Sequence, residues 1–231
     1  MKTVLLFAMK EEAKETIESF NLKKIESNSF LALDIYEGEI SGEAVALGVL
    51  GHDERFGVSS IGTVPAALAA AELIRIYQPK ILINPGTAGG FKSRGGNIGD
   101  IYLPTKVLFH HREIPFENYQ AYGEGSYETN LEGELKNLDC KFGVFSASDS
   151  LTCSEREMKF FNKNEVVVKD MESAAIAYVC ERSSTKYVGV KSITDIVDGD
   201  IPTAEEFSTN LKSASNSLQS FLKLKLKDLL S

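Results

Sequence analysis

Cysteine and histidine are scarce in this chain of 231 residues, which has three of each. The cysteines, Cys140, Cys153 and Cys180, are odd in number and far apart, and they form no C-x-x-C pair. This usage predicts free thiols in a reducing compartment, and hence a cytoplasmic protein. The histidines, His52 and the adjacent pair at 110–111, have no cysteine or histidine partner at ligand spacing. The sequence therefore predicts no structural zinc and no other bound metal.

Positive charge is also in short supply, since 25 Lys and Arg residues face 33 Asp and Glu residues, for a net charge of −8. A general nucleic-acid binder needs the opposite balance, so nucleic acid is not expected as a partner, whereas a small neutral or cationic ligand remains open. A long apolar run is missing as well. No stretch approaches the roughly 20 residues that a membrane-spanning helix requires, so no membrane partner is expected.

The first residues imitate a secretory signal, because Lys2 precedes an apolar run over residues 3–9. That run is short for such a signal, ends in Lys10-Glu11-Glu12 and lacks a small-residue cleavage site. A buried first strand is the better interpretation. With 43% hydrophobic residues the chain can bury one core, and we expect a single domain over residues 1–231.

Apolar periodicity and turn residues predict alternating strands and helices. Two capping boxes, Ser154-x-x-Glu157 and Thr203-x-x-Glu206, are expected to open helices. The alternation predicts an α/β protein, a three-layer α/β/α domain with a mixed central sheet. The other expected elements are strands over 4–7, 80–84, 101–109, 166–168 and 187–193, helices over 11–20, 64–77 and 172–180, and an antiparallel pair over 30–49 that turns near Gly38.

Ligands of such sheets bind at the carboxyl ends of the strands, and four predicted strand ends carry unusual residues. Residues 84–90, Asn-Pro-Gly-Thr-Ala-Gly-Gly, would let the backbone approach an anion or a sugar, or could form only a tight turn. The segments Met9-Lys-Glu-Glu12 and Lys169-Asp-Met-Glu172 place carboxylates where a helix dipole favours them without any function. Lys191 inside a buried strand implies a carboxylate or a wet cavity nearby, with Asp195 at the strand end. A lysine that reaches the sheet edge and an aspartate that starts a turn would explain both residues equally.

Four of these motifs, in this order and spacing, resemble the 5′-methylthioadenosine/S-adenosylhomocysteine nucleosidases of the nucleoside phosphorylase-like family. The resemblance runs from residue 1 to about residue 218. Three further segments are similar to the plant-type branch of these enzymes. The family motifs are Ala8-Met9-x-x-Glu12, Asn84-x-Gly-Thr-Ala-Gly-Gly90, Asp170-Met171-Glu172-x-Ala174-Ala175 and Thr194-Asp195, and the branch segments are Phe91-Lys92, Asp149-Ser150-Leu151 and residues 197–207.

The resemblance implies hydrolysis of the N-ribosidic bond of 5′-methylthioadenosine without a cofactor, and leaves open how far S-adenosylhomocysteine is cleaved. Asp195 would hold or donate the proton at adenine N7, and Glu12 would be the general base for water. This division of roles follows the logic of inverting glycosidases. Glu172 would bind the ribose hydroxyls and help stabilise the cationic sugar, while Met171 would pack against the ribose.

The resemblance implies further substrate contacts. Thr87 and Lys191 would position water or the carboxylates, Met9 would line the site, and the strand around Leu151 and Thr152 would present backbone groups to the adenine edge. Bacterial family members often have Ser, Phe and Arg in place of Thr87, Leu151 and Lys191. Leucine cannot stack on adenine as phenylalanine does. The plant-type branch shares these changes, so they do not indicate lost activity.

Two features bear on the ribose 5′ end and on assembly. An extra loop, residues 51–57, precedes Ile61, which is expected to touch the ribose and its 5′ group. The resemblance also implies a homodimer in which the neighbour completes each pocket. The candidate for that contribution is the segment over residues 110–116, which contains two histidines, Ile114 and Pro115.

Two alternatives remain open. A purine nucleoside phosphorylase would share the fold but use phosphate, which needs arginines; no arginine follows the first strand, and Glu12 would repel phosphate. A non-catalytic nucleoside-binding protein on the same fold would bind without turnover, although all the expected acid and base positions are occupied.

Overall fold

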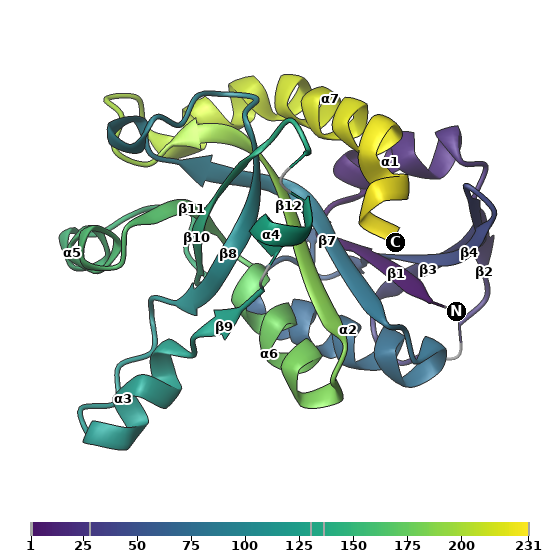
Figure 1. Cartoon of the computed structure of the whole chain (residues 1–231), viewed down its shortest axis with the longest axis horizontal. Helices are drawn as coiled ribbons and strands as arrows, with labels where there is room; N and C mark the ends of the chain where they lie inside the picture. The colour runs from purple at the N-terminus through teal and green to yellow at the C-terminus, as the bar shows by residue number, and fades with distance from the viewer. Residues whose placement is uncertain (1, 28, 130, 136, 231) are drawn as a thin grey trace.

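A mixed β-sheet between two layers of helices forms the centre of the molecule (Figure 1). The computed structural model describes residues 2–27, 29–129, 131–135 and 137–230. The strands of the sheet are β1 (Thr3–Phe7), β2 (Lys23–Ile25), β3 (Leu33–Ile40), β4 (Glu43–Leu50), β7 (Ile81–Gly90), β8 (Ile101–Phe109), β9 (Tyr127–Glu128), β10 (Lys141–Ala147), β11 (Val166–Asp170) and β12 (Lys186–Ile196). They follow the order β11-β10-β8-β12-β7-β1-β4-β3-β2, with β9 paired to β8.

Two helices cover each face of the sheet. α1 (Lys10–Ser19) and α7 (Thr203–Leu230) pack together on one face, and α2 (Thr63–Tyr77) and α6 (Ser173–Ser183) pack together on the other (Figure 1). Parallel pairs such as β1–β7 and antiparallel pairs such as β8–β12 occur in the same sheet. The predicted fold class is therefore confirmed. None of the helices within the described residues has both the length and the apolar character needed to span a bilayer.

Strand β1 shows how the sheet fills both layers. Its residues are all buried, and successive side chains of a strand point to opposite faces. Val4 and Leu6 contact the apolar cluster under α2 and α6, whereas Leu5 and Phe7 contact the cluster under α1 and α7. This explains why residues 4–7 are continuously apolar, and it confirms the predicted buried first strand.

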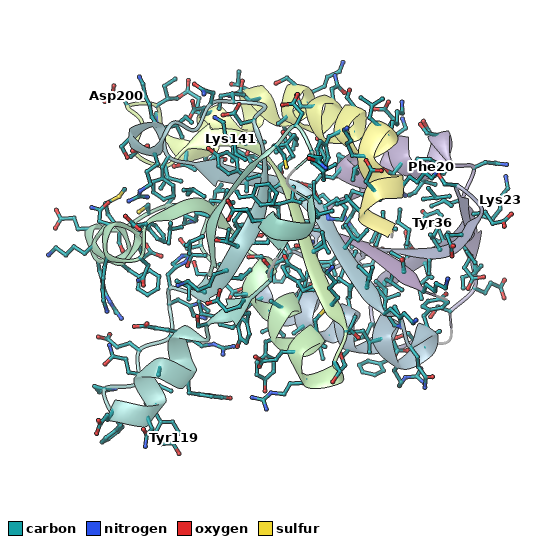
Figure 2. All side chains as sticks on the ribbon, in the orientation of Figure 1. Phe20, Lys23, Tyr36, Tyr119, Lys141 and Asp200 are labelled. Carbon is teal, nitrogen blue, oxygen red and sulfur yellow. The ribbon has the colours of Figure 1, made fainter. Side chains whose placement is uncertain are left out.

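The remaining elements lie outside these layers. Figure 1 shows α3 projecting away from the body of the molecule, and Figure 2 shows Tyr119 on this helix, at the periphery. These elements are α3 (Glu117–Glu124), α4 (Leu131–Leu135), α5 (Glu155–Lys163), the 3₁₀ turn η1 (Lys92–Arg94), and a two-stranded hairpin of β5 (His52–Asp53) and β6 (Val58–Ser59).

Two strand boundaries differ from the prediction. The turn between β3 and β4 lies at Ser41 and Gly42, not near Gly38, which is inside β3 and packs against Leu22. The strand predicted to end at Asn84 continues as β7 through residues 84–90. These small residues are buried and hydrogen-bonded to β12, so they form neither a tight turn nor a loop.

The two predicted capping boxes behave differently. Ser154 caps α5 as expected, because its hydroxyl accepts from the N–H of Glu157 and its own N–H donates to the Glu157 carboxylate at 2.7 Å. The box at Thr203 is wrong, since Thr203 is already helical and the Glu206 carboxylate instead accepts from the N–H of Ile196 at 2.7 Å. The Glu206 side chain thus makes a longer-range contact at the end of β12 and not the local contact that a capping box requires.

The role of α7 in covering the sheet can be tested on two of its leucines. Leu222 is fully buried and Leu224 is 77% exposed. Leu222→Ala should lower the free energy of unfolding by about 2–5 kcal/mol, because it leaves a cavity in the core. Leu224→Ala, the control on the same helix, should change it by less than about 0.5 kcal/mol. Denaturant unfolding of both variants measures the difference, and equal effects would contradict this packing.

Candidate active site

A cavity opens where the carboxyl ends of β1, β7, β11 and β12 meet, as expected for a sheet of this kind. Its wall combines apolar side chains with several carboxylates. Such a mixture of apolar surface and a few convergent polar groups is typical of small-molecule sites. The lining residues are Ala8, Met9, Glu12, Ile61, Thr87, Ala88, Gly89, Leu151, Lys169, Asp170, Met171, Glu172, Thr194, Asp195 and Phe207.

Glu12 reaches the cavity from the first turn of α1. It is buried, and its Oε1 accepts hydrogen bonds from the N–H and from the hydroxyl of Thr87, both at 2.7 Å. Burial raises the pKa of this carboxyl, while Lys191 and the Thr87 hydrogen bonds oppose the rise. Glu12 is therefore held in one orientation and has a stronger affinity for a proton than an exposed glutamate.

Lys191 is the cation of a buried charge cluster. Its Nζ lies 3.1 Å from Oδ2 of Asp170, and both side chains are 1% exposed. Burial lowers the pKa of Lys191, but Asp170, Glu172 and Glu12 together raise it, so the lysine stays charged. A Cβ on Gly86 would lie 3.1 Å from this Nζ and 3.4 Å from Oε1 of Glu12. The glycine therefore leaves the space between the two charged groups open.

Glu172 is the N-cap residue of α6, and its carboxyl interacts electrostatically with the same lysine. Its Oε1 accepts from the backbone N–H of Gly62 at 3.1 Å. Burial raises the pKa of Glu172 to about 7, against the opposing effect of Lys191. Full ionisation of Glu12, Asp170 and Glu172 would leave two uncompensated negative charges in a buried site. At neutral pH the cluster is therefore poised to hold a proton.

Asp195 stands near the end of β12 and also lines the cavity. It is 2% exposed, and its Oδ1 accepts from the Thr194 hydroxyl at 2.7 Å. Burial raises the pKa of Asp195, while the Thr194 hydrogen bond and the charge of Lys169 oppose the rise. The cavity thus offers several carboxyl groups whose raised pKa suits them to give or take protons.

Most of the residues predicted from the sequence come together at this cavity. Lys191 is not in the lining but lies directly beneath it, in contact with Asp170. Thr152 lies outside the lining, where its carbonyl accepts from the Ser150 hydroxyl at 3.1 Å. The predicted residues found in the lining are Met9, Glu12, Ile61, Thr87, Leu151, Met171, Glu172 and Asp195.

Sequence reasoning missed two lining residues, Lys169 and Phe207. Lys169 is buried on β11 and donates hydrogen bonds to the carbonyls of Ser150 and Leu151, the latter at 3.0 Å. It directly precedes Asp170, so the argument applied to Lys191, that a lysine in a buried strand needs partners, would have found it. Phe207 lies in α7, and no local signal separates a lining phenylalanine from a core one.

Within the described part of the chain, no group of three or more His, Cys, Asp or Glu side chains is placed to hold a metal ion. The three cysteines are free thiols in the structure, and burial raises the pKa of each of them.

Comparisons with known proteins place the chain among enzymes. A model of the phosphorylase superfamily matches residues 2–227. The 5′-methylthioadenosine nucleosidase of Arabidopsis thaliana is 38% identical over 220 residues, which cover 94% of this chain and 82% of the relative. The 5′-methylthioadenosine/S-adenosylhomocysteine nucleosidase of the same plant is 37% identical over 223 residues, covering 95% of this chain and 88% of the relative.

A solved structure supports the same placement. The apo form of the 5′-methylthioadenosine nucleosidase of Arabidopsis thaliana matches with a TM-score of 0.95 at 36% identity. The match covers 100% of this chain and 96% of that structure.

The charge cluster can be tested through Lys191→Met, which leaves the carboxylates without their cation. Breaking a buried ion pair costs about 3–5 kcal/mol of unfolding free energy. A carboxyl with a raised pKa stabilises the fold below its unfolded pKa and loses that contribution as the pH rises through its folded pKa. Because the substitution raises the pKa of Glu12 and Glu172 further, the loss should be greater near pH 8 than near pH 5. Denaturant unfolding at both pH values measures it, with the surface variant Lys141→Met as control. An equal loss at both pH values would contradict the cluster.

Proposed function

We propose that this chain, a member of the phosphorylase superfamily and within it of the 5′-methylthioadenosine/S-adenosylhomocysteine nucleosidases, is a hydrolase. The bond that it hydrolyses is the N-ribosidic bond of 5′-methylthioadenosine. The products are adenine and 5-methylthioribose. S-adenosylhomocysteine is the second candidate substrate. The observation that carries the proposal is the set of buried carboxyls with raised pKa, Glu12, Glu172 and Asp195, around one cavity.

The chemistry divides between the two sides of the cavity. Breaking the bond builds positive charge on the ribose and negative charge on the departing adenine, so the base needs a proton. Asp195 is suited to hold that proton and give it to N7, because burial raises its pKa. Glu12 activates water from the side of α1, and Glu172 binds the ribose hydroxyls beside it. This arrangement follows the inverting logic of two carboxyl groups with different roles.

The apolar lining serves the substrate's less polar parts. Met171 and Met9 line the cavity beside the two glutamates and are suited to pack against the ribose. Leu151 faces the adenine side, where Lys169 fixes its carbonyl. Thr152, outside the lining, contributes through the backbone of the same loop.

Phosphorolysis is the alternative that needs a separate test. No arginine occurs among the described residues that line the cavity, and the Glu12 carboxylate would repel phosphate. The purified protein should be incubated with methylthioadenosine, with and without phosphate, and the products separated by chromatography. Free adenine and methylthioribose in equal amounts under both conditions would support hydrolysis. Methylthioribose-1-phosphate would overturn it, and binding without turnover would indicate a non-catalytic protein.

The acid and base roles predict the effect of two isosteric substitutions. Glu12→Gln and Asp195→Asn should each lower turnover by about 100-fold or more, since positioned acids and bases contribute about 10²–10⁴. Glu11→Gln, on the exposed neighbour of Glu12, and Asp200→Asn, on the exposed loop after β12, are matched controls and should stay near the wild type. Steady-state kinetics, with circular dichroism to verify folding, measures this. Near-full activity of either test variant would remove its assigned role.

The extra loop over residues 51–57, which together with β6 forms the hairpin, predicts selectivity at the ribose 5′ end. The strands β5 and β6 of the hairpin lead through Ser60, whose N–H donates to the carbonyl of Gly51 at 2.8 Å, into Ile61 of the cavity wall. S-adenosylhomocysteine carries a charged amino acid where methylthioadenosine has one methyl group. We expect kcat/KM to be at least about 10-fold higher for methylthioadenosine, or about 1.4 kcal/mol. Competition between the two substrates in one tube measures the ratio, and equal consumption would contradict the role of the hairpin.

A homodimer is proposed for assembly, and the contact surface needs one correction. The His110 side chain is buried within its own protomer, where Nδ1 lies 2.9 Å from the Ser146 hydroxyl, so it does not face a partner. The neighbouring Phe116 and, on the projecting α3, Tyr119 are 68% and 59% exposed, and Val64 at the start of α2 is 65% exposed. These apolar surfaces support pairing through α2 and α3.

Sedimentation of the wild type and of Phe116→Lys tests this assembly. We expect a dimer for the wild type and a shift toward monomer for the variant, because a charge would be buried in an apolar interface. Glu128→Lys, an exposed site on β9, is a control that should leave the assembly unchanged. A fully active wild-type monomer would contradict the proposal.

The single-domain organisation over residues 1–231 and the cytoplasmic location stay predictions. Limited proteolysis of the purified chain and fractionation of cells that express it would test them.

A further inference from the structure

The carboxylate of Asp149 joins two walls of the cavity that are distant in sequence. Asp149 lies two residues before Leu151, in the loop after β10. Its Oδ1 accepts from the backbone N–H of Thr63 at 2.6 Å, and its Oδ2 accepts from the Thr63 hydroxyl at 2.7 Å. Thr63 is the first residue of α2, where backbone N–H groups have no partner within the helix. The loop that carries Leu151 is thereby fastened to the start of α2.

The residue before Thr63 connects this contact to Glu172. The N–H of Gly62 donates to Oε1 of Glu172 at 3.1 Å. Gly62 has a φ of 106°, and a Cβ at this position would lie 2.6 Å from Oδ1 of Asp149. Glycine therefore meets two requirements here, a left-handed backbone and the close approach of the Asp149 carboxylate. Asp149 and Glu172 hold two successive N–H groups of the same helix start.

We infer that Asp149 is a positioning residue of the active site, which fixes the start of α2 so that the Gly62 N–H orients Glu172 and which anchors the adenine-side loop of Leu151. Its consequence for catalysis rests on the proposed function. Asp149 is outside the cavity lining, so it acts through Thr63 and Gly62 and not through the substrate. Asp149 belongs to the segment Asp149-Ser150-Leu151, which is similar to the plant-type branch. Of this segment, only Leu151 has a role in the proposed reaction.

The contact has an electrostatic consequence for Glu172. The charged groups that face this carboxyl are Lys191 of β12, Asp170 of β11 and Glu12 of α1, and α2 contributes the Gly62 N–H. The Gly62 hydrogen bond favours the ionised carboxylate and lowers its pKa, which burial holds at about 7. If the start of α2 loosens, this hydrogen bond weakens and the pKa of Glu172 rises. A reaction that needs ionised Glu172 then gains activity only at a higher pH.

Two substitutions at Asp149 separate the effect of its hydrogen bonds to Thr63 from the effect of its negative charge. Asp149→Ala removes both hydrogen bonds and should lower kcat/KM by about 10-fold, because Glu172 and the Leu151 loop are then less well positioned. It should also move the ascending, acid limb of the kcat/KM profile to higher pH. Asp149→Asn should recover most of both properties, because its carbonyl can accept from the Thr63 N–H and its amide can donate to the Thr63 hydroxyl. Thr63→Val, which loses only the hydroxyl contact, should lie between the wild type and Asp149→Ala.

Asp100→Ala is the matched control. The Asp100 carboxylate also accepts from a backbone N–H, that of Asn97 at 2.8 Å, and from a side chain, that of Lys141 at 2.6 Å, but it is not in the cavity lining. The control variant should lose stability without any shift of the acid limb. If the limb of Asp149→Ala also stays in place, or its kcat/KM equals that of the wild type, the inference is overturned.

Two further measurements keep the test decisive. If Asp149→Ala does not fold, Thr63→Val decides the matter, because wild-type kinetics in that variant would contradict the inference. Calorimetric binding of adenine to wild type and Asp149→Ala is independent of turnover, and weaker binding by the variant is expected. If the wild type releases no adenine from methylthioadenosine, the proposed function fails, while the adenine measurement still supports or overturns the anchoring of the Leu151 loop.

Discussion

The ion pair between Lys191 and Asp170 is the interaction on which the cavity depends. Both side chains are 1% exposed, and an unpaired charge at such a buried position would lower the stability of the fold. Asp170 also accepts from the hydroxyl of Ser173 at 2.6 Å and so ties the pair to the start of α6, next to Glu172. The lysine is therefore held where its charge acts on Glu12 and Glu172 together. Without that fixed cation, burial would raise the pKa of both glutamates further.

The register between β7 and β12 places the residues around this ion pair, and loops contribute little to their positions. β7 and β12 are parallel, and their register sets Gly86 beside Lys191 and Thr87 beside Ser192. Because Gly86 has no side chain, Glu12 can reach across from α1 to the backbone and hydroxyl of Thr87. Groups that must agree within a few tenths of an ångström are thus mounted on a sheet buried on both faces, which is the most rigid support the fold offers.

How much of this the sequence predicts depends on the range of each interaction. Continuous apolar runs and helical periodicity predict the three layers, and the Ser154 capping box holds because all its partners lie within one turn. The box at Thr203 fails because Glu206 bonds the distant N–H of Ile196. The carboxylates at strand ends are predictable, since a sheet brings such ends together. The contacts of Lys169 with the loop carbonyls and the reach of Phe207 into the cavity depend on packing between separate elements, which no local pattern records.

The same burial that suits these carboxyls to catalysis works against stability. A group with a folded pKa near 7, such as Glu172, stabilises the fold fully only below its unfolded pKa, and this contribution is lost as the pH rises through about 7. An exposed glutamate would avoid that loss, but its charge would be screened by water and would stabilise a cationic sugar less. The apolar clusters on the two faces of the sheet offset the loss, with fully buried residues such as Leu73 of α2 and Leu222 of α7. Two packed layers therefore allow a charge cluster at the sheet's edge that a smaller core could not sustain.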